Sequence, residues 1–125
     1  MVDLINRLGE KGIYTLVDFH QDIISEKYCG DGIPVWLIDE IHGYRSFPFP
    51  WSLKKMPLNE SGVPAWKDCD QKNWGKYYVS DDVGRTFNHL YDTKHYLHRK
   101  FVAYWQTIAK RLRGNPHIIA YEIIN

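Results

Sequence analysis

Two short apolar runs near the ends of the chain constrain the fold more than any other feature. Residues 13–19 and 118–125 are rich in β-branched and aromatic side chains, a composition typical of strands buried on both faces of a parallel sheet. Residues 94–113 come before the second run and carry apolar side chains at helical spacing. The order strand, helix, strand predicts a parallel pair of strands joined by a crossover helix.

A further helix is predicted over 2–11, ending at Gly12, so helices and strands alternate along the chain. The commonest architecture built from this unit is the eight-stranded (β/α)8 barrel of about 250 residues or more. A doubly wound open sheet is the alternative, but no glycine-rich phosphate-binding motif follows the first strand, where the sequence reads HQD.

Two parallel strands with flanking helices leave open edges and an uncovered apolar face. The sequence therefore predicts an α/β fold that is part of a (β/α)8 TIM barrel, and we expect the missing remainder of the barrel as its partner.

Residues 20–93 form a connection many times longer than usual between a strand and its helix, and connections of this length are usually functional. We expect short helices over 34–41 and 86–91 and irregular structure elsewhere. Most of the aromatic residues, which make up 15% of the chain, lie in this connection. Its tryptophans either form a small core under the connection or stack on sugar rings, and both readings stay open.

Polar residues follow both strands. His20 and Asp22 come directly after the first strand, and Asn125 stands at the end of the second. In a parallel barrel such residues face the substrate, while Asp18 lies deeper. The alternative is that His20 bonds a nearby carbonyl and Asp22 caps a turn. Glu122 lies within the second strand, and we expect it to brace the interior through hydrogen bonds and not to act in catalysis.

Three histidines, His89, His95 and His98, are candidate ligands of a zinc ion. Only the spacing of the last two fits one helix face, and no third ligand is evident. We therefore expect solvated helix histidines and no metal.

The formal charge of +1, with both signs interspersed, argues against a nucleic acid partner. The chain contains no apolar stretch long enough to span a membrane, and its first residues lack the order of a signal peptide.

The two cysteines, Cys29 and Cys69, would close a loop of about 40 residues, and a disulfide there would add roughly 4 kcal/mol of stability. The alternative is two unrelated free thiols. Asn59-Glu60-Ser61 is an N-glycosylation pattern in the same region. Together these features favour an extracellular or a lysosomal or other lumenal location for the parent protein.

Three segments carry a family resemblance: VDFHQD at 17–22, CGDGIPVW at 29–36 and YEIIN at 121–125. They resemble glycoside hydrolase family 5, and within it the endoglycoceramidase-related members. The likeness covers essentially the whole chain and implies that its strands are the third and fourth of the barrel.

The resemblance implies a retaining double displacement, in which one Glu after the fourth strand is the acid/base and another after the seventh is the nucleophile. The acid/base Glu would follow Asn125, so neither catalytic residue lies in this chain. By the same matching, His20 and Asp22 would contact the sugar or orient the catalytic groups, and Asn125 would reach the hydroxyl beside the anomeric carbon. Trp36 and Trp74 are candidate sugar or lipid contacts. No metal or organic cofactor is expected.

The implied substrate is a glycan or a glycolipid, and the implied reaction is release of the oligosaccharide from ceramide in the parent protein, with other β-glucosidic linkages as the fallback. We expect this chain alone to be inactive. The competing hypothesis is a catalytically inactive truncated relative, or a partial gene product, that at most binds glycan or a partner.

Overall fold

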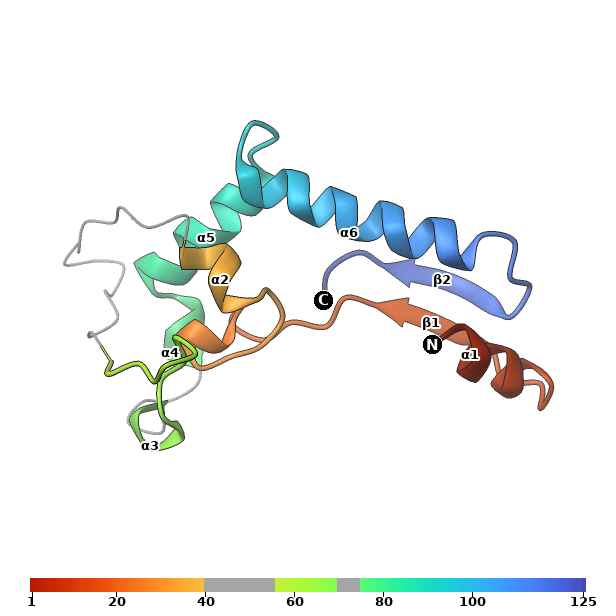
Figure 1. The fold of residues 1–125 in the computed structure, drawn as a ribbon, viewed down its shortest axis with the longest axis horizontal. Helices are drawn as coiled ribbons and strands as arrows, with labels where there is room; N and C mark the ends of the chain where they lie inside the picture. Colours follow the sequence, from red (N-terminus) through yellow and green to blue (C-terminus); the bar gives the residue numbers. More distant parts are fainter. Residues whose placement is uncertain (40–55, 70–74) are drawn as a thin grey trace. The chain divides into compact units, whose positions relative to one another are not determined.

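The structure, a computed structural model, describes residues 1–39, 56–69 and 75–125, which form two compact units. One unit contains residues 1–20 and 100–125, and the other contains residues 21–99. In Figure 1 the ribbon is coloured along the sequence, and the two parts of the first unit are drawn in red and in blue. Each unit is described by itself.

The first unit is built on a parallel pair of strands, as the sequence predicts. Strand β1 (Thr15–Asp18) pairs with β2 (Ile118–Glu122), so that Thr15 lies opposite Ile118 and Asp18 opposite Glu122. Figure 1 shows the two arrows side by side and pointing the same way.

Both strands are shorter than the predicted runs 13–19 and 118–125. At the start of β1 the N–H of Ile13 bonds the carbonyl of Leu8 at 3.0 Å. This bond closes the turn that follows α1, so the N–H of Ile13 is unavailable to the strand ladder. Strand β2 ends at Glu122, three residues before the predicted end.

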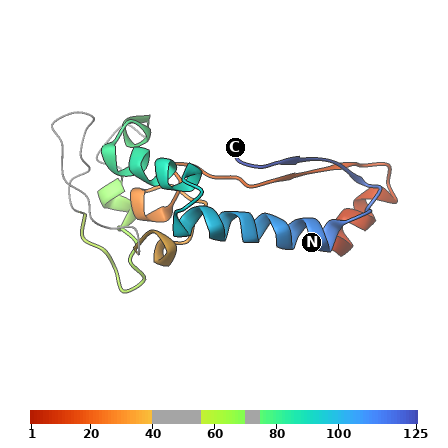
Figure 2. The same cartoon turned by 90° about the horizontal axis from the view of Figure 1, so that it is seen from above.

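Two helices pack on this sheet. Helix α1 (Val2–Gly9) and helix α6 (Tyr96–Leu112) are each slightly shorter than the predicted 2–11 and 94–113. Figure 2 shows the part of α6 that belongs to this unit lying along the strands. The core holds buried Ile5, Val17 and Leu112, surrounded by Trp105, Ile108 and Ile118. Amphipathic helices thus cover one face of the sheet.

The second unit is more helical than the sequence indicates. Besides the 3-10 turn η1 (Glu26–Tyr28), it contains α2 (Val35–Asp39), α3 (Trp66–Cys69), α4 (Gly75–Tyr78) and α5 (Asp81–Tyr91). The expectation of irregular structure outside two short helices is therefore wrong, because side-chain packing stabilises turns too short to form alone.

Helix α5 begins five residues before the predicted start at residue 86. Ser80 caps it, since the Ser80 hydroxyl oxygen accepts a hydrogen bond from the N–H of Val83 at 3.3 Å. Asp81 and Asp82 occupy the first turn, where carboxylates favour the helix dipole. This cap is a sequence signal that the prediction missed.

The core of the second unit is apolar. Its fully or nearly fully buried apolar side chains are Ile23, Ile24, Tyr28, Ile33, Val35, Leu37, Ile38, Tyr77, Val83, Leu90 and Leu97. A disulfide joins Cys29 to Cys69 within this unit, with 5.5 Å between the two Cα atoms. The pairing predicted from the sequence is present.

Two tryptophans of the long connection lie among the described residues. Trp36 is 59% exposed and Trp66 is 82% exposed, so neither contributes to a core. Trp74 lies outside the described residues. Among the helices that the structure describes, none has the length and apolar character needed to cross a bilayer.

Candidate functional site

In the first unit, the carboxyl ends of the two strands lie together. The N–H of Phe19 bonds the carbonyl of Glu122 at 3.1 Å, and the N–H of Asn125 bonds the carbonyl of Phe19 at 3.4 Å. His20 and Asn125 therefore follow neighbouring parallel strands at the same edge of the sheet, as the sequence predicts. Polar residues at this edge are placed as ligand-binding residues are in parallel α/β proteins.

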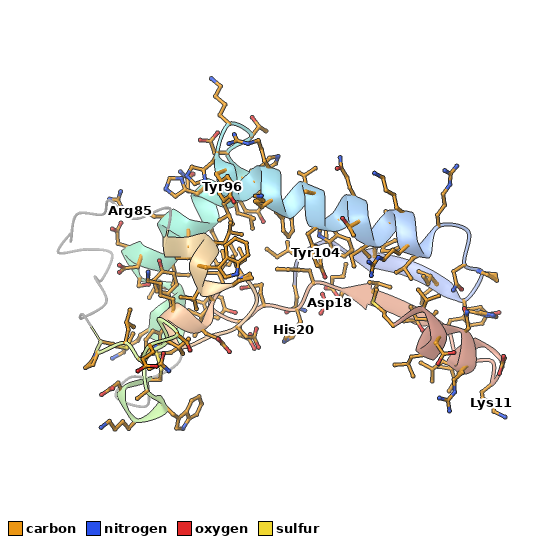
Figure 3. The ribbon with its side chains drawn as sticks, in the orientation of Figure 1. Lys11, Asp18, His20, Arg85, Tyr96 and Tyr104 are labelled. Atoms are coloured by element: carbon orange, nitrogen blue, oxygen red, sulfur yellow. A yellow bond between two sulfur atoms is a disulfide. The ribbon has the colours of Figure 1, made fainter. Side chains whose placement is uncertain are left out.

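Asp18 and His20 form a pair at the end of β1. Nδ1 of His20 lies 3.2 Å from Oδ2 of Asp18, and the two side chains are 60% and 24% exposed, respectively. Figure 3 labels both residues, which lie close together where β1 ends. A carboxylate at this distance favours the proton on Nδ1, so Nε2 of the neutral ring is an acceptor.

The other carboxyl oxygen of Asp18, Oδ1, is buried and bonds no group among the described residues. A buried carboxylate oxygen without a partner is costly.

Aromatic side chains from α6 pack against the same edge of the sheet. The ring of Phe19 meets Phe101 and Tyr104 edge-on, with ring centroids 5.2 and 5.3 Å apart. Nε1 of Trp105 donates a hydrogen bond to the carbonyl of Ile123 at 3.0 Å. The helix therefore fixes the short segment between β2 and Asn125. Sequence reasoning assigned these aromatics to the helix face but missed this role.

In the second unit, Asp22 is held on both its backbone and its side chain. Its N–H donates to Oδ1 of Asp31 at 2.8 Å, and its carbonyl accepts from the N–H of Asp31 at 2.6 Å. The hydroxyl of Tyr78 donates to Oδ1 of Asp22 at 3.2 Å. Asp22 does more than cap a turn, because Tyr78, 56 positions away in the sequence, bonds its carboxylate.

The backbone after Asp22 is strained. Ile23 and Ile24 have φ angles of 56° and 63°, which are rare for β-branched residues. Such strain occurs mainly where the surrounding structure enforces it, and often at functional sites. The enforcing segment includes Gly30, where a Cβ atom would lie 2.6 Å from the carbonyl carbon of Asp22. Only glycine permits this close approach.

The three histidines considered for zinc are half-buried, and two of them stack. The rings of His89 and His95 have centroids 4.0 Å apart, and Nδ1 of His98 lies 2.8 Å from the carbonyl of Leu90. Burial lowers the pKa of His89, and repulsion from His95 lowers it further. All three side chains keep part of their exposure, as expected of solvated histidines, but His95 lies in the turn before α6 and not on a helix. Within residues 1–39, 56–69 and 75–125, no three His, Cys, Asp or Glu side chains are arranged to hold a metal ion.

The remaining candidates are placed as follows. Trp36 lies exposed on α2, and Glu122 is the last residue of β2. Asn59 is exposed, and its Oδ1 accepts hydrogen bonds from the N–H groups of Ser61 and Val63 at 2.9 and 3.0 Å.

Known proteins give a consistent comparison. No family model matches the chain. An endoglycoceramidase of Hydra vulgaris is 35% identical over 125 residues, covering 98% of this chain and 23% of the relative. An endoglycoceramidase of Cyanea nozakii is 34% identical over 124 residues, covering 98% and 24%. The chain thus spans about a quarter of the length of these relatives.

Solved structures agree. Endo-glycoceramidase II from Rhodococcus sp., solved in complex with a cellobiose-like imidazole, superimposes with a TM-score of 0.64 at 25% identity, covering 98% of this chain and 24% of that one. Its complex with a five-membered iminocyclitol gives a TM-score of 0.63.

The chain has a partial α/β fold of glycosidase-related origin. The fold is defined by the parallel strands, whose carboxyl ends carry polar residues, and the origin by these matches. Within that class the chain is similar to endoglycoceramidases, which it matches along nearly its whole length.

Proposed function

We propose that the chain supplies the third and fourth strands of a (β/α)8 barrel in a retaining glycoside hydrolase of the family 5 type. The observation that carries the proposal is the placement of His20 and Asn125 at one edge of a parallel sheet, in a chain that matches endoglycoceramidases over 98% of its length. The sheet also leaves Leu16 and Ile119 exposed, at 47% and 66%. Further strands and side chains of a complete barrel would cover such residues.

In the proposed site, residues of this chain bind and orient the sugar. Asn125 donates to the hydroxyl beside the anomeric carbon, and His20, oriented by Asp18, bonds a neighbouring hydroxyl. Asp22 accepts from the sugar while Tyr78 holds its carboxylate. Such hydrogen bonds raise the rate when they tighten in the transition state.

The two carboxylic acids of a retaining hydrolysis lie about 5 Å apart across the scissile bond. We place neither of them in this chain: the acid/base Glu follows Asn125 in the complete protein, and the nucleophile comes from a strand on the opposite side. Residues 1–125 alone are therefore proposed to be inactive.

The proposed substrate is a glycosphingolipid, cleaved between its oligosaccharide and ceramide. The alternative is a substrate with another β-glucosidic linkage. Trp36 and Trp74 are proposed to contact the sugar or the lipid, a role in keeping with the exposure of Trp36. The Cys29–Cys69 disulfide favours action outside the cell or in a lysosomal or other lumenal compartment, because cytosolic thiols are kept reduced.

The test compares residues 1–125 with a version extended through the downstream coding sequence. Both are assayed for sugar release from a glycosylceramide and from an aryl β-glucoside, and only the extended version should turn over. Turnover by residues 1–125 that disappears on replacing Asp22 or Glu122 would overturn the proposal.

A second candidate function is a truncated relative that binds glycan without cleaving it. A stop codon directly after Asn125 in the transcript would favour it, whereas a continuation with Glu would favour the enzyme.

A further inference from the structure

The Cys29–Cys69 disulfide connects the two segments that hold Asp22. Asp31, two residues after Cys29, exchanges two hydrogen bonds with the backbone of Asp22, at 2.8 and 2.6 Å. Gly30, between Cys29 and Asp31 in the sequence, lies against the carbonyl group of Asp22. One end of the disulfide is therefore adjacent to the segment that fixes the Asp22 backbone.

The other end of the disulfide is connected to the residue that holds the Asp22 side chain. The hydroxyl of Tyr77, whose side chain is buried, donates to the carbonyl of Cys69 at 2.7 Å. Tyr78, the next residue, donates to Oδ1 of Asp22 at 3.2 Å. Helix α4 (Gly75–Tyr78) has only four residues, so its own backbone cannot fix Tyr78. The bond from Tyr77 to Cys69, the packing of Tyr77, and two bonds from Ser80 to the carbonyl of Tyr77, at 2.6 and 3.0 Å, supply that constraint.

We propose that Tyr78 is a positioning residue for Asp22 and that the Cys29–Cys69 disulfide keeps Tyr78 in place, so that sugar binding depends on the oxidation state of the cysteine pair. The inference rests on the proposed function, in which Asp22 contacts the sugar. It adds a residue and a covalent bond that act on the substrate through Asp22.

Reduction by a dithiol defines the second state. The disulfide bond breaks, the dithiol supplies two electrons and two protons, and it closes to its own cyclic disulfide while Cys29 and Cys69 become thiols. The Cys69 segment is then held only by non-covalent contacts. The bond from Tyr77 to Cys69 no longer relates Tyr78 to the segment around Asp31, and the carboxylate of Asp22 loses its fixed orientation.

The experiment is a two-by-two comparison on the complete protein that contains these residues. The KM and kcat for an aryl β-glucoside are measured for the wild type and for Tyr78→Phe, each oxidised and after treatment with dithiothreitol. We expect Tyr78→Phe to raise KM about tenfold, which is the usual effect of a lost hydrogen bond to a charged group. Reduction should raise the wild-type KM by a similar factor and change the KM of Tyr78→Phe less than about twofold, because the two changes remove one interaction.

Tyr91→Phe is the matched control. Tyr91 lies exposed at the end of α5 in the same unit. This variant should keep the wild-type KM and the full response to reduction. The proposal is overturned if Tyr78→Phe leaves KM unchanged, or if reduction raises KM by the same factor with and without the Tyr78 hydroxyl.

Amide hydrogen exchange separates this inference from the proposed function. On reduction, the amides of Asp22 and Asp31 should exchange faster while those of β1 in the first unit keep their protection. Uniform loss of protection in both units would mean global unfolding and would overturn the inference. If the wild type turns over neither the aryl β-glucoside nor a glycosylceramide, the proposed function is rejected. The exchange pattern would still decide whether the disulfide holds Asp22.

Discussion

Trp105 and Ile123 are joined by a hydrogen bond from the indole N–H to the backbone carbonyl, at 3.0 Å. Trp105 lies on α6 and Ile123 is the first residue after β2, so the bond ties the helix to the segment that leads to Asn125. We expect Trp105→Phe in the complete protein to lower kcat/KM several-fold, because Asn125 becomes less well positioned. Steady-state kinetics measure the effect. Val102→Ala, on the exposed side of the same helix, should leave kcat/KM unchanged.

His20 and Asn125 should affect turnover more than binding. Replacing either by Ala in the complete protein removes hydrogen bonds that tighten in the transition state, so kcat should fall by about two orders of magnitude while KM changes little. The measurement is kcat and KM on an aryl β-glucoside. Unchanged turnover in both variants would make these residues structural.

Gly30 should not tolerate a side chain. A Cβ there would lie 2.6 Å from the carbonyl carbon of Asp22 and 2.7 Å from Cβ of Ile23, so Gly30→Ala should lower the free energy of unfolding by about 2 kcal/mol or more. Urea denaturation measures it. Gly84→Ala is the control, since Gly84 lies within α5 with open space around its Cβ position. That change should raise stability by about 0.5–1 kcal/mol. Equal destabilisation by both variants would refute the close approach.

His89 should titrate below an ordinary histidine. Burial and then repulsion from His95 lower its pKa from 6.5, with a smaller lowering from Arg85 and an opposing effect from Asp92. A histidine whose pKa is lowered by folding contributes stability above its unfolded pKa, and that contribution is lost as the pH falls from about 6.5 through the folded value. An NMR titration of the histidine Cε1 protons measures the midpoint. His95→Gln should raise it toward 6.5, and an unchanged midpoint would contradict the stacked pair.

Asn59 should carry a glycan when the protein is made in a eukaryotic secretory pathway. Its side chain is exposed, and the bonds it makes to Ser61 and Val63 use Oδ1, which remains an acceptor after the amide nitrogen is glycosylated. The measured quantity is the loss of mass on treatment with an amidase that removes N-glycans. Asn59→Gln and Ser61→Ala should abolish it, whereas Asn88→Gln, outside any such pattern, should not. An unmodified wild type would refute the assignment and weaken the proposed lumenal location.

The sequence by itself determined the elements whose signals are local. Runs of β-branched and aromatic residues predict β1 and β2, and apolar side chains at helical spacing predict α6, each to within a few residues, because burial selects apolar side chains in patterns that can be read without the structure. Parallel pairing then places His20 and Asn125 at one edge.

Tertiary structure decided the contacts between residues far apart in sequence. Tyr78 and Asp22 are 56 positions apart, and no local repeat relates them. The stacking of His89 on His95 and the strained backbone at Ile23 likewise arise from packing. Periodicity reports which face of an element is buried, whereas the partner of a polar side chain depends on how separate segments meet, and only the folded chain specifies that.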